Sequence, residues 1–535
     1  MALFSDLAVS TSALTEALSG HRDIGAALSH APSRLDGNCI LFATDGRRIY
    51  ARGPLNELNR IATAHDSEQG YAATSARHLA EVLGRPLRTD LLATRLAFPT
   101  STAELEAQSL WSGVDWHRGG HTIEVSERRV AVLHQCVPSG HLDLSTGAAE
   151  FRAQLTRAVA ARAAGAGHTG CDVSGGYDST TIAFLLSATR PDFTAFTSGN
   201  RNASDDDPLW ADRALKQMAY GNVLRVSAAE MPLPFDDFTN VPVPYEEPFV
   251  GFANTARMSF IARYLRSVNV TDHFGGHGGD EVLGLDESYL PEAFRRNPLT
   301  GLRQAKSHAF LNRWPLIPAM RFLILRENRA TALKRELAQA HTGTKGTSIP
   351  SRWQVGPIRF PRWMPADTTD LAAQTIREDP EHLPDSWDHR ALSVVQGSGR
   401  TTETIRSIYG VEGVELHAPF LDENVVASVL SIRPEEHLDP STPKALLPAS
   451  MDGLVPRFVY DRRSKSTGLT DAFAGKRLNK QRLHAYFDQS ALVKYGLADQ
   501  ISLHRAIDDA LDTDVAPIAL WRTIAVESWL RTLTT

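Results

Sequence analysis

The chain has 535 residues, of which 42% are hydrophobic and 22% are charged, as in an ordinary globular protein with two or more domains. Its formal net charge is −6, which excludes the basic excess typical of nucleic-acid-binding proteins, and no run of about 18 apolar residues could span a membrane. The first residues lack a basic signal-peptide segment and Cys39, Cys136 and Cys171 are far apart, so we expect a cytoplasmic protein without a disulfide framework or zinc site.

The first part of the chain is predicted to be an α+β domain. Alternating apolar and polar residues predict strands, and an apolar stripe at helical spacing predicts helices. Asp45 and Gly46 supply the turn of the first hairpin. The predicted elements are a hairpin over 38–51, a helix over 72–83, strands over 121–125 and 129–135, and a helix over 148–164. We place this domain over residues 1–147 and a second domain over 148–535.

A glycine-rich segment, Val-Ser-Gly-Gly-Tyr-Asp-Ser over 173–179, follows a predicted strand over 169–172 and leads into an apolar helical run. Gly175 and Gly176 can turn sharply, which lets backbone amides approach an anion beside a helix N-terminus. Asp178 would repel a phosphate, so its expected partner is Mg²⁺, which itself binds phosphate. The segment predicts a phosphate cradle; the alternative is a glycine turn that only opens a helix.

From residue 169 onward, strands and helices are predicted to alternate. The strands are predicted over 169–172, 193–197, 223–226 and 268–274, with a helix over 211–219. This alternation is typical of an α/β domain with a parallel sheet, which binds ligands at the carboxyl ends of its strands. Beyond residue 285 we expect mostly helices, ending in an amphipathic helix over 518–533 that docks onto the protein.

A second glycine-rich motif, Gly-Gly-His-Gly-Gly-Asp-Glu-Val-Leu-Gly, occupies 275–284 directly after the last predicted strand. Its position brings Asp280 to the same edge of the sheet as Asp178. Two carboxylates on adjacent strand ends can share the Mg²⁺ of a nucleoside triphosphate. We therefore predict that Asp178 and Asp280 are the metal ligands.

The segment 294–345 is strongly basic. It holds eleven Lys and Arg residues against two acidic residues, with Phe310, Trp314 and Phe322 among them. One interpretation is a solvated helix face with buried aromatic side chains. The other is a surface for an acidic or peptide partner, since the acidic balance of the whole chain disfavours nucleic acid.

Three motifs resemble those of the asparagine synthetase superfamily of ATP-pyrophosphatase type: 174–179, 275–284 and 413–422, which reads Gly-Val-Glu-Leu-His-Ala-Pro-Phe-Leu-Asp. The resemblance implies an α/β synthetase domain with a parallel sheet and many helices. It also implies ATP and Mg²⁺, since in this family a carboxylate is adenylated, pyrophosphate leaves and an amine attacks to form an amide. By the same resemblance, pyrophosphate is held by Ser174, Gly175, Gly176 and Ser179, and the adenosine pocket is lined by Val173, Ser198 and Gly276.

Three later segments, 443–456, 461–468 and 520–530, look most like those of the lasso peptide cyclases of this superfamily. That resemblance implies attack of a core peptide's N-terminal amine on an internal Asp or Glu side chain, which closes a macrolactam. It also implies a precursor core peptide as substrate, and a leader-binding protein and a leader peptidase as partners. Lys465 falls at the position of the family's catalytic lysine, where an ammonium stabilises charge on phosphoryl and carbonyl oxygens. We expect the folded peptide to bind over the helical region 285–400.

His277 stands where asparagine synthetases carry a glutamate. A histidine is suited to deprotonating an attacking ammonium near neutral pH, so we predict a general base; the alternative is a side chain that only shapes the pocket. Glu403, nineteen residues before Asp422, is predicted to orient the imidazole, and its alternative is an acid on a helix surface.

The stretch 37–84 resembles the later part of a glutamine amidotransferase domain. The intact domain begins with a nucleophilic cysteine after the initiator methionine, whereas residue 2 here is Ala2. We therefore expect a truncated domain without glutaminase chemistry, serving as a scaffold. The rival predictions are a β-lactam synthetase-like enzyme, an ammonia-dependent asparagine synthetase and a non-catalytic peptide-binding protein.

Overall fold

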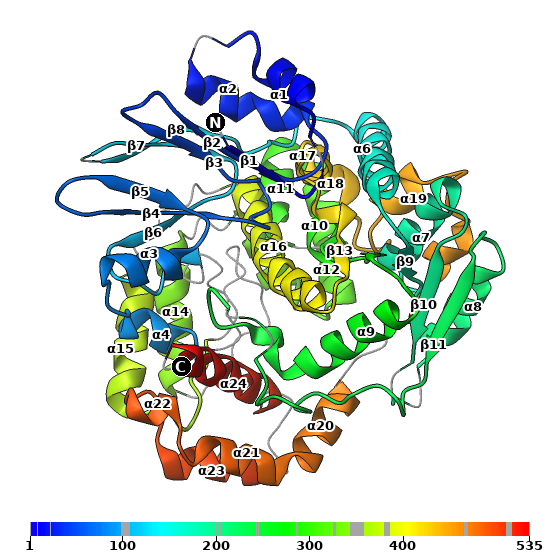
Figure 1. Cartoon of the computed structure of the whole chain (residues 1–535). Coiled ribbons are helices and arrows are strands. Elements are labelled where there is room, and N and C mark those ends of the chain that lie inside the picture. The colour runs from blue at the N-terminus through cyan, green and yellow to red at the C-terminus, as the bar shows by residue number, and fades with distance from the viewer. Residues whose placement is uncertain are drawn as a thin grey trace.

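The computed structural model describes most of the chain (Figure 1). The described residues are 2–7, 9–21, 23–97, 107–127, 129–199, 201–202, 205–241, 243, 245–284, 287–324, 328–342, 358–378, 386–464, 469–509 and 516–533. Among the predicted site residues, Lys465 lies outside these ranges.

The N-terminal region forms two antiparallel sheets (Figure 1). The first has the order β1-β2-β3-β7-β8, from Ala2–Ser5, Cys39–Thr44, Ile49–Arg52, His121–Val125 and Val130–Gln135. The second has the order β5-β4-β6, from Gly70–Ala73, Ile61–His65 and Val114–His117. Its helices are α1 (Thr11–Leu18), α2 (Ile24–His30), η1 (Ala31–Arg34), α3 (Ala76–Leu83) and α4 (Thr89–Thr94).

The strands predicted here are confirmed, and one predicted helix is too long. β2 and β3 pair across the predicted turn, where Gly46 has φ +88°. The helix predicted over 72–83 begins only at Ala76, because 70–73 pair with β4 as strand β5. Ser75 caps this helix by accepting a hydrogen bond from the His78 amide, a start signal that the periodicity alone did not reveal.

The rest of the chain contributes a five-stranded parallel sheet in the order β11-β10-β9-β12-β13. They are β9 (Thr169–Asp172), β10 (Thr194–Ser198), β11 (Asn222–Val226), β12 (Asp272–Phe274) and β13 (Glu415–His417). The strand predicted over 268–274 is shorter, because helix α9 (Thr255–Ser267) runs up to it and the chain turns at Asn269, which has φ +66°. Beyond residue 285 the described chain is mostly helical, as predicted, and β13 is a strand that the sequence analysis did not predict.

Helices cover both faces of this sheet. On β10, Ala195 points into a core shared with α6 (Leu144–Gly165), α7 (Tyr177–Thr189), α8 (Asp207–Leu215) and α17 (Glu423–Leu430). The next residue, Phe196, points into a core shared with α9, α16 (Trp387–Val411) and α24 (Ala516–Thr532). A strand exposes alternate residues to opposite faces, so two buried neighbours require a layer on each side. α8 begins four residues before the predicted 211–219, with Pro208 in its first turn.

The other helices of the described chain all follow β11. They are η2 (Val250–Asn254), α10 (Gly279–Val282), η3 (Glu287–Tyr289), α11 (Leu290–Arg296), α12 (Pro298–Leu311), α13 (Leu316–Ile324), α14 (Arg329–Thr342), α15 (Ala366–Arg377), η4 (Pro419–Leu421), α18 (Pro434–His437), α19 (Leu446–Ser450), η5 (Arg457–Asp461), α20 (Leu469–Leu478), α21 (Lys480–Phe487), α22 (Ala491–Lys494) and α23 (Gln500–Asp508). The predicted docking of the last helix is confirmed: Trp529 is fully buried and its indole donates to the Tyr245 carbonyl at 3.1 Å. Within the described ranges, no helix combines the length and apolar character needed to cross a bilayer.

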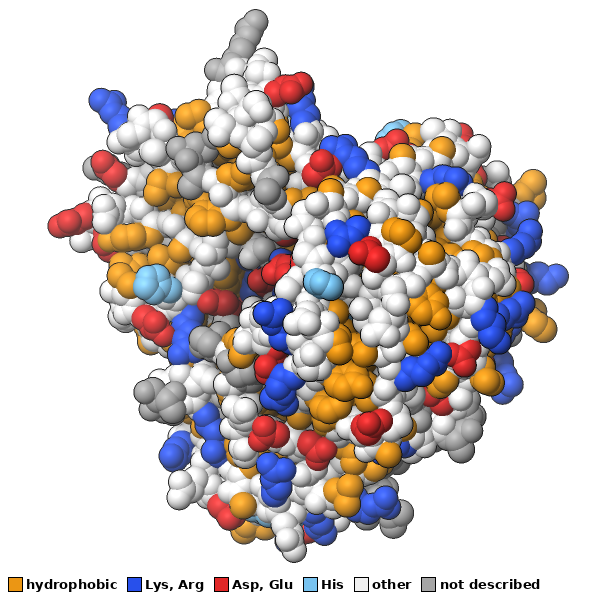
Figure 2. Space-filling view, turned by 45° about the vertical axis from the view of Figure 1, so that its right-hand side comes forward, with side chains coloured by type: hydrophobic (Ala, Val, Ile, Leu, Met, Phe, Trp, Pro, Cys, Tyr) orange, Lys and Arg blue, Asp and Glu red, His pale blue; other side chains and the backbone are white. Residues whose placement is uncertain are grey.

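The basic segment forms α11 to α14, and its aromatic side chains differ in environment. Phe322 is buried in the core, whereas Phe310 is 84% exposed at the end of α12. Trp314 stacks on His308 with ring centroids 6.0 Å apart. On the face drawn in Figure 2, basic and acidic side chains are interspersed and neither sign forms a continuous stripe.

Buried polar contacts join the N-terminal region to the part of the chain after residue 147. Arg52 on β3 forms an ion pair with Glu423, and the two side chains are 1% and 6% exposed. Arg162 on α6 contacts Asp6 and Asp422, each at 2.8 Å. Figure 1 shows α16 lying between the antiparallel sheets and the parallel sheet, so this helix faces both parts of the molecule.

Candidate active site

The glycine-rich loop lies between β9 and α7, at the carboxyl edge of the parallel sheet. Gly175 has φ +75°, and a Cβ atom there would lie 2.5 Å from the Cβ of Trp210. Ser174 Oγ lies 2.8 Å from Ser179 Oγ and accepts a hydrogen bond from the Gly176 amide at 3.2 Å. The first amides of α7 therefore face a tight loop, which is the arrangement that binds phosphate groups.

Replacement of Gly175 by Ala is expected to weaken ATP binding about tenfold, because the left-handed conformation costs an L-residue about 1–2 kcal/mol before the clash with Trp210 is counted. Calorimetric titration with Mg-ATP measures the effect. The matched control is Gly453→Ala, since Gly453 also has φ +75° but has no atom within 4 Å of the added Cβ. Equal ATP affinity in both variants would mean that the loop does not hold the nucleotide.

The two predicted metal ligands lie together. Lys444, in the left-handed region with φ +50°, forms an ion pair with Asp178, and its Nζ lies 2.9 Å from Asp280 Oδ1. Both carboxylates thus reach one cationic nitrogen, which means that they are close enough to share a single cation. Asp178 is 18% exposed and Asp280 is 57% exposed, so the pair faces solvent on one side.

This pair fits the Mg²⁺ that the family resemblance implies. Mg²⁺ is commonly held by one or two carboxylates together with substrate phosphates, so a cage of protein ligands is not needed. Among the described residues, no group of three or more His, Cys, Asp or Glu side chains is arranged to hold a metal. Asp178 and Asp280, beside the glycine loop, are therefore the residues suited to a phosphate-bound ion.

A cavity of about 380 Å³ opens beside the loop. His277 and Ser198 both line it, as the sequence predicts for a pocket at the strand ends. The described residues around it are Asp172, Ser174, Phe196, Thr197, Ser198, Pro234, Asn254, Arg257, Met258, Ile261, His277, Ile405, Tyr409 and Trp521. Two predicted adenosine contacts are absent from this described lining. Val173 is fully buried with its amide bonded to the Phe196 carbonyl, and Gly276 packs against Ser179.

His277 has a neutral imidazole near pH 7. Burial lowers its pKa below 6.5, although the nearby Asp172 carboxylate opposes the shift. Asp172 also accepts a hydrogen bond from His273 Nε2 at 3.0 Å, which fixes the carboxylate at the end of β9. Sequence reasoning missed Asp172 and Lys444. The signal for Asp172 was its place as the last residue of a strand beside the glycine loop.

The comparison with known families agrees with this geometry. A family model described as asparagine synthase matches residues 150–531, which include the glycine loop, both carboxylates and His277. The chain belongs to the asparagine synthase family. Members of this family are ATP-dependent amide ligases. A search of curated proteins found no match.

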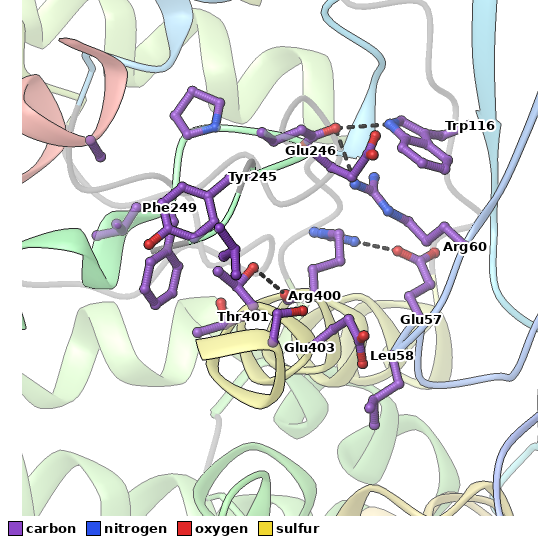
Figure 3. A pocket seen from close by; sticks show the side chains of 18 of the residues that line it. Glu57, Leu58, Arg60, Trp116, Tyr245, Glu246, Phe249, Arg400, Thr401 and Glu403 are labelled. Carbon is purple, nitrogen blue, oxygen red and sulfur yellow. Dashed lines mark hydrogen bonds and ion pairs between the residues drawn. The ribbon is translucent and has the colours of Figure 1, made fainter. Parts of the chain in front are cut away.

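The sequence predicts that Glu403 orients the imidazole of His277, but the structure does not bring the two side chains together. Glu403 lines a different cavity, between α16 and the N-terminal region (Figure 3). Its carboxylate lies 3.1 Å from Arg406, and none of the hydrogen bonds among described residues joins it to the imidazole. Burial raises the pKa of Glu403 to about 7, against the opposing effect of Arg406. The orienting role is therefore corrected: neighbouring positions of a helix face different directions, and Glu403 lines the other cavity while Ile405 of the same helix lines that of His277.

The described residues before Lys465 are anchored beside the glycine loop. Tyr177, the first residue of α7, donates to the carbonyls of Tyr460 and Arg462 at 2.8 and 2.6 Å. Arg462 forms ion pairs with Asp206 and Asp207 at the start of α8. The segment that leads to the family's lysine position is thus held against both the phosphate loop and its neighbouring helix.

The three cysteines of this asparagine synthase-family chain are all described, and none is activated. Burial raises the pKa of Cys39 to about 12 and raises those of Cys136 and Cys171 as well. A thiol of raised pKa is a poor nucleophile at neutral pH, since the thiolate is the reactive form. The described thiols therefore lack the lowered pKa that is typical of a nucleophilic cysteine.

Proposed function

We propose that the protein is a lasso peptide macrolactam synthetase, with its synthetase domain over 148–535. The observation that carries the proposal is the meeting of Asp178, Asp280 and a neutral His277 at one sheet edge beside the phosphate loop. A carboxylate activated by ATP and an amine that must lose a proton are the two needs of amide ligation, and this edge offers groups for both. The resemblance of the later segments to lasso peptide cyclases selects the substrate: an internal Asp or Glu side chain and the N-terminal amine of a core peptide.

The residues of the site have separate tasks in this proposal. The amides of the loop from Ser174 to Gly176 hold phosphate oxygens, and Lys444 offers an ammonium at the same place. Mg²⁺, when bound to Asp178 and Asp280, would neutralise phosphate charge and help pyrophosphate to leave. Lys465, carried over from the family resemblance, stabilises charge on the activated carbonyl. His277 accepts the proton of the attacking ammonium at an imidazole nitrogen.

The amine has to come from the substrate or from solution. With the pKa values of the three thiols raised, no described cysteine can release ammonia from glutamine. Attack by the peptide's own amine is intramolecular, so it gains the rate advantage of a held nucleophile. This supports cyclisation over a reaction with free ammonia.

The direct experiment is incubation of the purified protein with Mg-ATP and a leader-free precursor peptide encoded beside it, followed by mass spectrometry. Loss of one water from the peptide, with formation of AMP and pyrophosphate, is the expected result, and Lys465→Ala is expected to abolish it. A leader-binding protein and a leader peptidase are added in a parallel reaction. Turnover instead with a small β-amino acid, or with aspartate and ammonia, would move the assignment to a β-lactam synthetase-like or asparagine-forming enzyme.

The rate of amide formation is expected to fall as pH drops through the pKa of His277, which lies below 6.5. Only the neutral imidazole accepts a proton, so activity is present above that pKa and lost below it. His277→Gln is expected to remove this acid limb and to slow cyclisation about 10²–10⁴-fold. Pyrophosphate exchange into ATP is the control, because adenylation does not need the base. An unchanged pH profile in the variant would leave His277 only shaping the pocket.

A further inference from the structure

A second cavity, of about 360 Å³, lies between the N-terminal region and the synthetase part (Figure 3). Four separate parts of the chain build it. The N-terminal region contributes Glu57 and Arg60 among others, and the other described lining residues belong to 243, 245–250, α16 and the last helix α24. In Figure 3, Glu57 meets Arg400 of α16 in an ion pair, so the two parts of the molecule meet across the opening.

This cavity is adjacent to the one that holds His277. On α16, Thr404 lines the interdomain cavity and the next residue, Ile405, lines the other. On α24, Arg522 lines the interdomain cavity and its neighbour Trp521 lines the cavity of His277. Two helices thus form the common wall, and a ligand in the interdomain cavity is one helix thickness from the candidate site.

The charges around the interdomain cavity are balanced. Four glutamates, Glu57, Glu246, Glu247 and Glu403, stand against four arginines, Arg60, Arg95, Arg400 and Arg522. Three ion pairs join these side chains: Arg400 with Glu57, and both Arg60 and Arg95 with Glu247. A nucleotide or another polyanion would meet as many carboxylates as guanidinium groups, so the lining does not select one.

The lining offers a hydrogen-bond donor beside aromatic surfaces. The Arg60 side chain is 8% exposed, and its buried Nη1 has no hydrogen-bond partner among the residues that the structure describes. Its guanidinium lies 4.0 Å from the ring centroid of Trp116, and Tyr245 and Phe249 line the opposite part. A buried donor without a partner is costly, so it marks a place for an acceptor oxygen.

We propose that the interdomain cavity binds a segment of the peptide substrate while its reacting groups occupy the candidate site. A main-chain carbonyl of the peptide accepts a hydrogen bond from Arg60 Nη1, and an apolar side chain packs against Trp116 and Phe249. This inference rests on the proposed function. It makes the N-terminal region part of the substrate site rather than a scaffold. It also moves the peptide site away from most of 285–400, since Gly397 and Arg400 are the described residues of that range that line the cavity.

The test fills the cavity without disturbing the core. Thr401 and Ser407 line it from exposed positions on α16, so Thr401→Trp and Ser407→Trp place a ring in the opening at little cost to the fold. The matched control is Val411→Trp, which is 55% exposed on the same helix and lines neither cavity. The probe is a fluorescein-labelled form of the core peptide that the wild-type enzyme cyclises, measured by fluorescence anisotropy, with Mg-ATP binding measured by calorimetry.

Both cavity variants are expected to bind the labelled peptide at least about tenfold more weakly than the control, with ATP affinity unchanged. Peptide affinity and cyclisation equal to those of Val411→Trp would overturn the cavity assignment while leaving the proposed function standing. A wild-type enzyme that forms amides only from small amino acids would overturn both. As a second readout, a core peptide bearing a benzophenone side chain is expected to cross-link to the segments that contain Trp116 or Phe249. Cross-links confined to α12 or α13 would contradict the assignment.

Discussion

Asp178→Asn is expected to reduce ATP-dependent turnover at least about 100-fold and to raise the Mg²⁺ concentration needed for half-maximal rate. Loss of a group that merely orients a metal ligand costs about 10–100-fold, so loss of a ligand is expected to cost at least the upper end of that range. The asparagine amide cannot supply the negative charge that holds a divalent ion. In this variant Asp280, whose Oδ1 lies 2.9 Å from Lys444 Nζ, is the carboxylate that remains of the pair.

The measurement is pyrophosphate exchange into ATP over a titration of Mg²⁺, with Asp280→Asn as a second variant. Asp212→Asn is the matched control. Asp212 lies on α8 and forms an ion pair at 2.7 Å with Arg225 of β11, and both side chains are about half exposed. A midpoint of thermal unfolding close to that of the wild type shows that the fold is retained. An Mg²⁺ requirement that does not change in either site variant would remove the carboxylates from metal binding.

The local part of this site could be predicted from the sequence, because its signals are local. The glycine loop, the helix after it and the strand before it lie within about twenty residues, so turn propensity and periodicity were enough. Asp280 could be placed as well, since parallel strands end at one edge of a sheet. The motif 275–284 directly follows β12, so its position alone places Asp280 at the carboxyl end of that strand.

Long-range contacts could not be predicted in the same way. Lys444 meets Asp178 across 266 residues of sequence, and no periodicity relates the two positions. β13 has three residues, too few for an alternating pattern, and it is recognised only by pairing with β12. The predicted role of Glu403 was wrong for a further reason: the distance along the chain from Glu403 to Asp422 says nothing about which face of α16 Glu403 occupies. The face depends on how the helix is rotated between the two parts of the molecule.

The attachment of the N-terminal region depends on a charge cluster that sequence patterns do not reveal. Arg162 lies on α6, in the family-matched part of the chain, and its side chain is 1% exposed. It contacts Asp422, within the third family motif, and Asp6, directly after β1. One guanidinium therefore compensates two carboxylates that are almost completely enclosed, and its loss would leave both without this counter-charge.

Arg162→Ala is expected to lower the free energy of unfolding by about 3–5 kcal/mol, because it leaves two buried carboxylates without their counter-charge. Equilibrium unfolding in urea, followed by tryptophan fluorescence, measures the loss. Arg157→Ala is the matched control on the same helix: its ion pair with Asp36 is about half exposed, so a loss of about 0–1 kcal/mol is expected. A loss in Arg162→Ala no greater than in the control would contradict the role of the cluster.

The difference between the two variants is also expected to depend on pH. Burial by itself would raise the pKa of Asp6, but Arg162 and the Asn38 amide together hold it below 3.8. The ion pair's contribution is therefore fully present above pH 3.8 and is lost as pH falls through the lower pKa of the folded state. The deficit of Arg162→Ala should be largest near neutral pH and should shrink in acid, where a protonated Asp6 no longer needs the guanidinium. A deficit that stays constant between pH 7 and the acid range would mean that Arg162 stabilises the fold by packing alone, with the charge of Asp6 playing no part in attaching the N-terminal region.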